Sequence, residues 1–453
     1  MQQFEHRKNY DQQIYSSDYE NPKVAYEFYF KLFGLVSAGM DSYQRAGPIK
    51  QDVSGQKLRR VYCQLISTLL WFFAIRSFVL MFIWDPQLQL MMGDITGLWN
   101  DYRMYYLMPM LYFSLQTAIT SSSFLSKERD LTWLVPFISV KQMQMNGHRS
   151  HYYNIKKYTV RITIGIFVSI CFVVALTGVV SYQYYITART KMTDEEFFYW
   201  LPWLIIHCLW IFYVAGITAF PLAYFNLVAV VFTKRFAQVC REIEDLADSD
   251  PGPPGSKNAA LTTLYYEHNE VCELVDESNM FWQTYTFFTY ITYIPCNCYV
   301  LYNLFFAKFD EILGPFTWGT FFFTIIFLAI LSVSAADVAA EAHAPYTALH
   351  TLSLLQLPID LEVNMSTFLH RVRGPTIGYS CLDLFVLTNA SISNTIAAVA
   401  SYFLIVADFS RSTVGRQTQT TAAPPTVSAV PDLVANLTTT AMSLMSSETT
   451  GSI

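Results

Sequence analysis

Long apolar stretches separated by polar ones run through most of the chain. Windows of about 18 or more mostly apolar residues, the length that a helix needs to cross a hydrocarbon core of about 30 Å, recur along the sequence. They cover residues 62–84, 104–125, 162–185, 198–232, 281–306, 316–336 and 384–407. No cleavable signal peptide is expected, because the residues before the first stretch are polar and rich in Tyr. The pattern predicts an all-α polytopic membrane protein with seven transmembrane helices.

Composition favours the same class of protein. The 453 residues are 53% hydrophobic and 14% charged, whereas soluble domains contain about 25% charged residues. An ordinary soluble domain of this length is therefore excluded. The cysteines fall within the apolar stretches or in segments expected on the cytoplasmic side, so no extracellular disulfide framework is predicted.

The distribution of positive charge predicts the orientation. Of the 29 Lys and Arg residues, 22 lie in the alternate segments 1–61, 126–161, 233–280 and 337–383, and 6 lie in the remaining segments outside the apolar stretches. Because positive segments stay cytoplasmic, the N-terminus is expected inside and the C-terminus outside. The expected organisation is a cytoplasmic segment (1–61), a seven-helix receptor or channel domain (62–409) and an extracellular, disordered Ser/Thr-rich tail (410–453) with a glycosylation sequon at Asn436.

The fourth, fifth and sixth helices are expected to extend into the cytoplasm. The fourth apolar stretch continues as an amphipathic sequence with Phe236, Val239, Ile243 and Leu246 on one stripe, until "DSDPGPPGSKN" breaks the helix. A helix over 259–306 would be about 70 Å long, more than twice the hydrocarbon thickness. The sixth helix continues to Pro345, which kinks or ends it. Segments 233–280 and 337–383 are therefore predicted to form a cytoplasmic anchor.

The last apolar stretch ends in "SYFLIVADFS" (401–410), which places Asp408 at its outer end. A carboxylate in the bilayer interior is costly, so such residues face water, a partner or a bundle interior. Two interpretations fit this position: a solvated residue at the interface, or an acidic ring formed where several copies of the helix meet around an axis. Composition leaves both open.

The C-terminal stretch "RVRGPTIGYSCLDLFVLTNASISNTIAAVASYFLIVADF" resembles the signature of the insect gustatory and odorant receptor superfamily. In that family the last span carries Thr-Tyr, five hydrophobic residues and Gln-Phe. Here Ser401 and Tyr402 take the Thr-Tyr place, residues 403–407 are the hydrophobic run, and Asp408 with Phe409 replaces Gln-Phe. The two departures suggest a distant branch, such as one from a nematode or another non-insect invertebrate.

The resemblance implies a ligand-gated cation channel in the plasma membrane that works as a homo- or heterotetramer, with a pore lined by the seventh helix. Ile405 and Phe409 would match the hydrophobic gate, and Asp408 the polar pore position next to it. Tyr402 would support the helix from behind. The implied partners are a small-molecule ligand and the lipid bilayer.

A ligand pocket for such an architecture is expected in the outer half of the bundle formed by the second to sixth spans. Aromatic residues suited to apolar or sugar-like ligands are abundant there, and the candidates are Tyr106, Tyr112, Trp203, Trp210 and Tyr302. The alternative is an interfacial aromatic belt, which Trp and Tyr form in many membrane proteins. Arg76, within the first span, requires a partner or a water-filled crevice unless it snorkels to the outer surface.

Competing functions have weaker support. A G-protein-coupled receptor would have an extracellular N-terminus and an acidic-Arg-Tyr motif after the third span, whereas "ERD" here follows the second span. We find no internal repeat typical of a secondary transporter and no enzyme motif. No cofactor or nucleic-acid partner is expected. No metal site is expected either, because the spacing of the acidic residues and histidines near the end of the sixth span matches no metal-ligand motif: Asp337, Glu341, His343, His350 and His370.

Overall fold

The computed structural model describes residues 22–36, 53–94, 103–127, 149–248, 254–306, 313–353 and 359–418. These residues are almost entirely helical, and the isolated bridge between Ser380 and Val386 is the β-type pairing among them. The helices are α2 (Pro22–Leu32), α4 (Val53–Leu80), α5 (Pro86–Met91), α6 (Arg103–Lys127), α8 (Arg149–Lys191), α9 (Asp194–Asp248), α10 (Pro254–Phe306), α11 (Leu313–His343), α12 (Pro345–Ser353), α13 (Ile359–Arg373) and α14 (Asn389–Thr418). The predicted all-α fold class is confirmed.

The seven predicted apolar stretches overlap helices α4, α6, α8, α9, α10, α11 and α14. By length and hydropathy, four segments of the described residues could cross a membrane on their own: Lys57–Leu80, Val160–Lys191, Asp194–Ala247 and Thr317–Ser353. The other three stretches contain Ser, Thr, Tyr and Asn among their apolar residues, which lowers their mean hydropathy. Some of these polar groups pair between helices, as where Gln116 of α6 donates to the hydroxyl of Thr289 of α10 at 3.1 Å.

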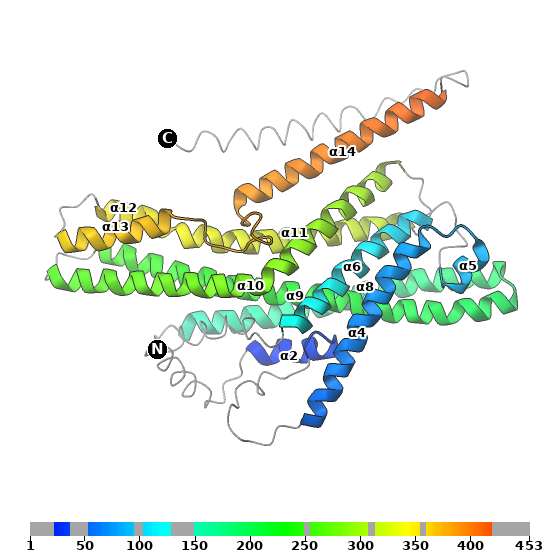
Figure 1. The fold of residues 1–453 in the computed structure, drawn as a ribbon, viewed down its shortest axis with the longest axis horizontal. Helices are drawn as coiled ribbons and strands as arrows, with labels where there is room; N and C mark the ends of the chain where they lie inside the picture. Colours follow the sequence, from blue (N-terminus) through cyan, green and yellow to red (C-terminus); the bar gives the residue numbers. More distant parts are fainter. Residues whose placement is uncertain are drawn as a thin grey trace.

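Helices α9 and α10 extend far beyond the thickness of a bilayer. They contain 55 and 53 residues, which corresponds to about 80 Å each. Figure 1 shows α9 along the long axis with the first half of α10 beside it, while the second half of α10 turns away; α5 lies at one end and α12 and α13 at the other. Helix α9 ends at Asp248, directly before the predicted breaker, and α11 ends just before Pro345, which opens α12. Helix α10 begins at Pro254, earlier than the expected residue 259, because proline is well suited to the first turn.

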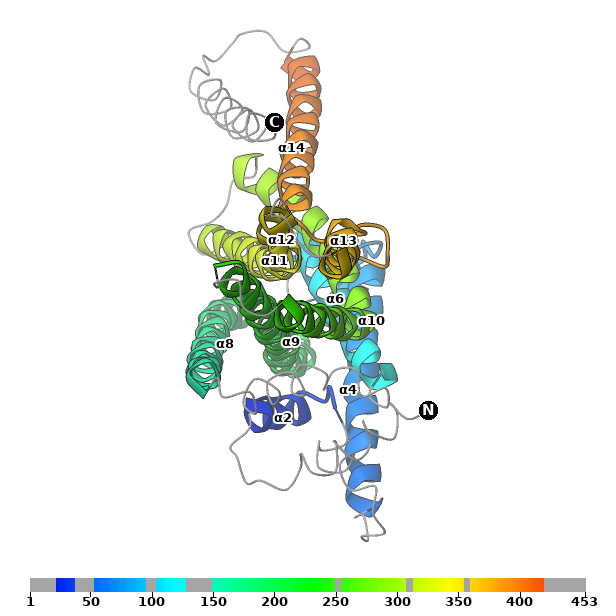
Figure 2. The ribbon, with the colours of Figure 1, turned by 90° about the vertical axis from the view of Figure 1, so that its left-hand side faces the viewer.

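A second hydrophobic core lies at the end of the bundle that carries α12 and α13, the end facing the viewer in Figure 2. The predicted stripe on α9 is confirmed, because Phe236, Val239 and Ile243 are fully buried. Val239 and Ile243 pack with residues of α10, α12 and α13, including Leu264, Leu349 and Phe368. We call this the anchor core. It gives the projecting helices a shared interior within a single chain.

His268 is buried beside the anchor core. Its Nε2 atom lies 3.0 Å from the carbonyl oxygen of Ala342, which requires a proton on Nε2, and its ring packs against Phe236 and Phe368. Burial lowers the pKa of His268 from its ordinary value of 6.5, and the nearby charge of Arg371 acts in the same direction. The folded state therefore holds the imidazole in its neutral form.

Acidification is expected to destabilise this end of the molecule. Because the folded-state pKa of His268 is lowered, its stability contribution is complete above about pH 6.5 and is lost as the pH falls below that value. Unfolding of the purified protein, followed by hydrogen exchange in α12 and α13 from about pH 7.5 to about pH 5.5, should show this loss. His268→Gln should flatten the dependence, while His350→Gln, at an exposed position of α12, should retain it. An unchanged dependence in His268→Gln would contradict the assignment.

Helix α2 packs against α9 on the side away from α14 (Figure 2). Its C-terminus is closed by Gly34 in the left-handed conformation (φ 67°) and by two backbone bonds, from Leu35 to Phe30 at 2.9 Å and from Gly34 to Lys31 at 3.3 Å. The turn directs Phe33 onto Gly216 of α9, where the space that a side chain would need is filled by the Phe33 ring. Part of the N-terminal segment is thus integrated into the main core.

A short hairpin over residues 378–387 precedes α14. Backbone bonds join Tyr379 to Leu387 and Cys381 to Phe385, and the turn places Leu382 and Asp383 at positive φ. The hairpin is fixed to α10 by contacts to Ser278, Asn279 and Thr286. Helix α14 consequently begins at Asn389 rather than at residue 384, and it continues past residue 409 to Thr418. The predicted glycosylation site, Asn436, lies outside the described residues.

Candidate functional site

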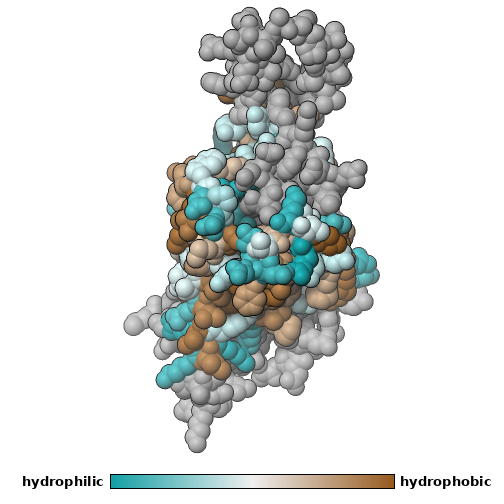
Figure 3. All heavy atoms as spheres, turned by 90° about the vertical axis from the view of Figure 1, so that its right-hand side faces the viewer, coloured by the Kyte–Doolittle hydropathy of each residue, from teal (hydrophilic) through white to brown (hydrophobic). Residues whose placement is uncertain are grey.

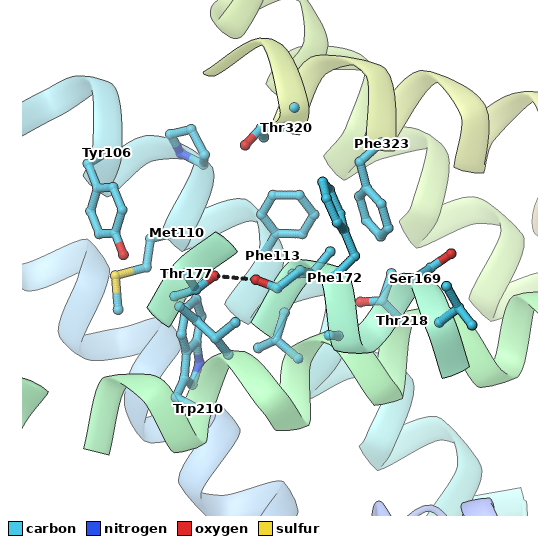
Figure 4. Close-up of a pocket in the computed structure, with 17 residues that line it drawn as sticks. Tyr106, Met110, Phe113, Ser169, Phe172, Thr177, Trp210, Thr218, Thr320 and Phe323 are labelled. Carbon is cyan, nitrogen blue, oxygen red and sulfur yellow. Dashed lines mark hydrogen bonds between the residues drawn. The ribbon is translucent and has the colours of Figure 1, made fainter. Parts of the chain in front are cut away.

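A cavity of about 530 Å³ lies among α6, α8, α9 and α11 (Figure 4). Each helix contributes residues spaced three or four apart, which places them on one face of that helix. The lining residues are Tyr106, Pro109, Met110, Phe113, Val168, Ser169, Phe172, Val173, Thr177, Trp210, Ile211, Val214, Ala215, Thr218, Gly319, Thr320 and Phe323. Its size and mostly apolar walls suit a small organic molecule.

One side of the cavity ends in a buried polar contact. The Tyr106 hydroxyl forms a hydrogen bond with Nε2 of His207, which is 4% exposed. The His207 ring stacks on Trp210 with centroids 5.3 Å apart, so the Tyr106 and Trp210 side chains stand between the histidine and the cavity. Sequence analysis did not select His207. The available signal was a histidine within the apolar run 198–232.

Arg76 lies beside this region and has protein partners. Its Nε atom donates to the carbonyl of Met92 at 2.7 Å, and Nη2 donates to the carbonyl of Gly93, so the guanidinium caps the C-terminal end of α5. The Trp203 ring lies 4.9 Å from the guanidinium carbon. Arg76 is 6% exposed, so in this structure these protein groups surround its charge.

A buried ion pair closes the loop between α4 and α6. Nε of Arg103 lies 2.5 Å from a carboxylate oxygen of Asp94, and the side chains are 4% and 1% exposed. Arg103 also donates to the carbonyls of Ile83 and Leu80, at the end of α4. Figure 3 looks onto this end of the molecule, where polar and apolar side chains lie next to each other. The pair fixes α5 and the start of α6 to the end of α4.

The candidate pocket residues are divided between several environments. Tyr106 and Trp210 line the cavity, whereas Trp203 packs on Arg76. Tyr112 of α6 and Tyr302 of α10 are half-buried and lie outside the cavity lining. Most of the lining was missed, because Val, Ala, Thr and Phe residues carry no signal of their own until the helices are placed.

The candidate pore residues lie on α14, which leaves the bundle after the hairpin (Figure 1). Ser401 and Asp408 are exposed, and Tyr402 and Ile405 are 55% and 60% exposed. The backbone at Phe409 is helical, but its side chain lies outside the described residues. Contacts with α10 and α11 hold the other side of the helix, including Phe403 against Phe305 with ring centroids 5.4 Å apart.

A metal centre is not formed by the described part of the chain. No cluster of three or more His, Cys, Asp or Glu side chains there has an arrangement that could hold an ion. Among the histidines considered above, the His343 side chain bonds to the backbone, with the carbonyl of Val372 at 2.6 Å and the amide of Ile377 at 3.2 Å. The site is therefore a cavity with one buried polar contact at its side.

Comparison with protein families identifies one that covers most of the chain. The family described as 7tm chemosensory receptor matches residues 28–411. The fold is similar to that of the insect olfactory receptor OR5 from Machilis hrabei in complex with eugenol, with a TM-score of 0.63, 10% identity, and coverage of 85% of this chain and 97% of the other. A second structure of the same receptor gives a TM-score of 0.55 and 12% identity over 84% and 96% of the two chains. No curated protein matches this sequence significantly.

Proposed function

Because this multi-pass membrane protein belongs to the 7tm chemosensory receptor family, we propose that it binds a small organic molecule and responds as an oligomeric ligand-gated cation channel in the plasma membrane. The cavity of about 530 Å³ is the observation that carries the ligand-binding part of this proposal. Its lining residues come from the predicted second, third, fourth and sixth spans, within the bundle where the resemblance predicts a pocket. The similar receptor from Machilis hrabei was solved with eugenol, a small molecule of suitable size.

Filling the cavity is expected to reduce sensitivity to the agonist strongly. Ala215 is 8% exposed and lines the cavity, so an indole ring at this position would occupy the space that a ligand needs. Ala215→Trp should reduce sensitivity to any agonist by about 100-fold or more. The measurement is the agonist-evoked current in cells that express the full chain, with a panel of uncharged odorants that includes eugenol.

The matched control is Ile205→Trp, on the same helix but 56% exposed and away from the cavity. It should leave sensitivity unchanged at equal surface expression. A normal agonist response in Ala215→Trp would place the ligand elsewhere.

Helix α14 supports the channel part of the proposal. Its exposed face carries apolar Tyr402 and Ile405, with Asp408 about one turn further along the same face. A single protomer leaves this face without a protein neighbour among the described helices, and copies of the chain arranged around an axis would cover it. Such an arrangement would place one carboxylate per protomer at the mouth of a shared pore.

Removing that carboxylate should weaken cation preference. Asp408→Asn is expected to shift the reversal potential of the agonist-evoked current under a salt gradient towards a less cation-selective value, and Asp408→Lys should shift it further. Glu195→Gln, which removes an exposed carboxylate at the start of α9, serves as the control and should have no effect. Identical reversal potentials in all variants would show that Asp408 does not lie in the pore.

The seven-span topology with a cytoplasmic N-terminus is part of the same proposal. It distinguishes this channel from a G-protein-coupled receptor, whose N-terminus would be extracellular. Epitope tags at the two termini, tested with antibodies on unpermeabilised cells, should be accessible at the C-terminus alone. Currents that persist when G-protein signalling is blocked would separate the two mechanisms directly.

A further inference from the structure

The walls of the cavity differ in their exposure. On the α6 and α9 side the lining is buried, with Met110 at 5%, Trp210 at 6% and Val214 at 8%. On the α8 side, Val168 is 60% exposed and Phe172 is 68% exposed, although both line the same cavity. The cavity is thus closed towards the bundle interior and open on the side of α8.

The opening lies between α8 and α11. Each of these helices packs against α9, but they do not pack along each other. Figure 4 shows Phe172 of α8 and Phe323 of α11 projecting into the cavity from the two sides of this gap. Ser169, one turn before Phe172, is also exposed and lines the cavity. These three side chains form what we call the lateral mouth.

The surface around the lateral mouth is apolar. On α8 it includes Ile164 and Phe167, which are 59% and 52% exposed, and on α11 it includes Phe322 and Ile326, which are 54% and 56% exposed. In a membrane protein such a surface faces hydrocarbon chains. The mouth lies in the interior of helix α8 and within predicted spans 162–185 and 316–336. It therefore opens into lipid.

The cavity's other flank is obstructed. The bond between Tyr106 and His207 lies beside it, and the Arg76 contacts with α5 and Trp203 pack the region next to that pair. A molecule that arrived from the aqueous phase on this flank would have to displace buried polar contacts. A molecule dissolved in the bilayer meets the exposed side chains of Ser169 and Phe172 at the lateral mouth.

We propose that the cavity takes an uncharged lipophilic molecule, which first partitions into the bilayer and then passes sideways between α8 and α11 through the lateral mouth. This inference rests on the proposed ligand cavity and specifies its ligand class and route. A charged headgroup is excluded by the hydrocarbon that the molecule crosses. Affinity for a homologous series should rise about fourfold for each added methylene until the cavity is full.

The test uses the purified full-length chain in phosphatidylcholine vesicles. The probe is 3-azi-1-octanol, a photoactivatable alkanol, and 1-octanol is the competitor. Peptide mapping should find labelled Trp210 and Phe323, protected by excess 1-octanol but not by octanesulfonate, which has the same chain and a charged head. The rates at which labelling appears after probe addition and disappears after dilution report passage into and out of the cavity.

Substitutions at the mouth should change these rates. Ser169→Trp narrows the opening and should slow loading and release together by about tenfold, while Phe172→Ala widens it and should accelerate both. The controls are Ile164→Trp and Phe322→Ala, at exposed positions that do not line the cavity. They should leave both rates unchanged.

The outcomes separate the route from the cavity itself. If 1-octanol protects against labelling but the rates of loading and release are the same in both mouth variants as in the unaltered chain, the lateral route is overturned and the ligand cavity stands. Protection by octanesulfonate overturns the uncharged ligand class. Labelling of Trp210 by a diazirine phospholipid that 1-octanol cannot displace would make the cavity a lipid-chain site, which also overturns the proposal. Absence of protectable labelling in the unaltered chain would reject the ligand cavity as well.

Discussion

Replacing Arg103 with alanine is expected to lower the free energy of unfolding by about 3 kcal/mol. The substitution removes the guanidinium beside a carboxylate that is 1% exposed, and it also leaves the carbonyls of Leu80 and Ile83 without this donor. Breaking a buried pair costs about 3–5 kcal/mol, and we expect the lower end because the charge of Arg76 also acts on Asp94. The loss should detach α5 and the start of α6 from α4.

Thermal or chemical unfolding of the purified protein measures this effect, and the chain offers a matched control. Arg189 and Asp194 form an ion pair of the same length, 2.5 Å, but their side chains are 53% and 88% exposed. Water and salt screen such a pair, so Arg189→Ala should change stability by less than about 1 kcal/mol. Equal losses in the two variants would show that burial of the Arg103 pair is not the decisive factor.

Enlarging Gly216 to leucine is expected to lower stability by about 2–3 kcal/mol and to displace α2. A Cβ atom at Gly216 would lie 2.0 Å from the nearest atom of the Phe33 ring, far inside van der Waals contact. Because Phe33 is 2% exposed and held by the closed turn after α2, the ring cannot move without moving that turn. Faster hydrogen exchange within residues 22–36 would report the displacement.

Two further variants test whether steric overlap is the cause. Phe33→Ala removes the obstructing ring, so Gly216→Leu should cost less in that background than in the unaltered chain. Gly178→Ala, in α8, meets nothing within 4 Å and should be neutral or slightly stabilising, since alanine favours helix. If the stability losses of Gly216→Leu and Phe33→Ala add in the double variant, steric overlap between the two positions is excluded.

The sequence predicts the helices well, because their signals are local. Long apolar runs locate the helices, and the proline-rich breaker after Asp248 sets the end of α9 without reference to the rest of the molecule. The apolar stripe through Phe236, Val239 and Ile243 likewise predicts a buried face on a helix beyond the membrane. Each of these conclusions requires residues that are neighbours along a single helix.

The cavity is harder to predict from the sequence, because its lining depends on how four helices are placed relative to one another. Aromatic character selected Tyr106 and Trp210, which line the cavity, but it selected Tyr112 and Tyr302 equally, and these lie elsewhere. Val214 and Ala215 gain their significance from the helices that face them. The hairpin before α14 was also not predicted, because its two residues with positive φ are Leu382 and Asp383 rather than the glycine or asparagine usual at such positions.

The contacts of Arg76 have a consequence for how the nascent protein enters the membrane. Its carbonyl acceptors lie 16 and 17 residues later in the chain, on Met92 and Gly93. A positive charge in the first hydrophobic helix would oppose insertion if it had to wait for a distant partner. Here the acceptors follow within a few seconds of synthesis at about 5–20 residues per second. The first helix can thus settle in the bilayer before the later helices have been translated.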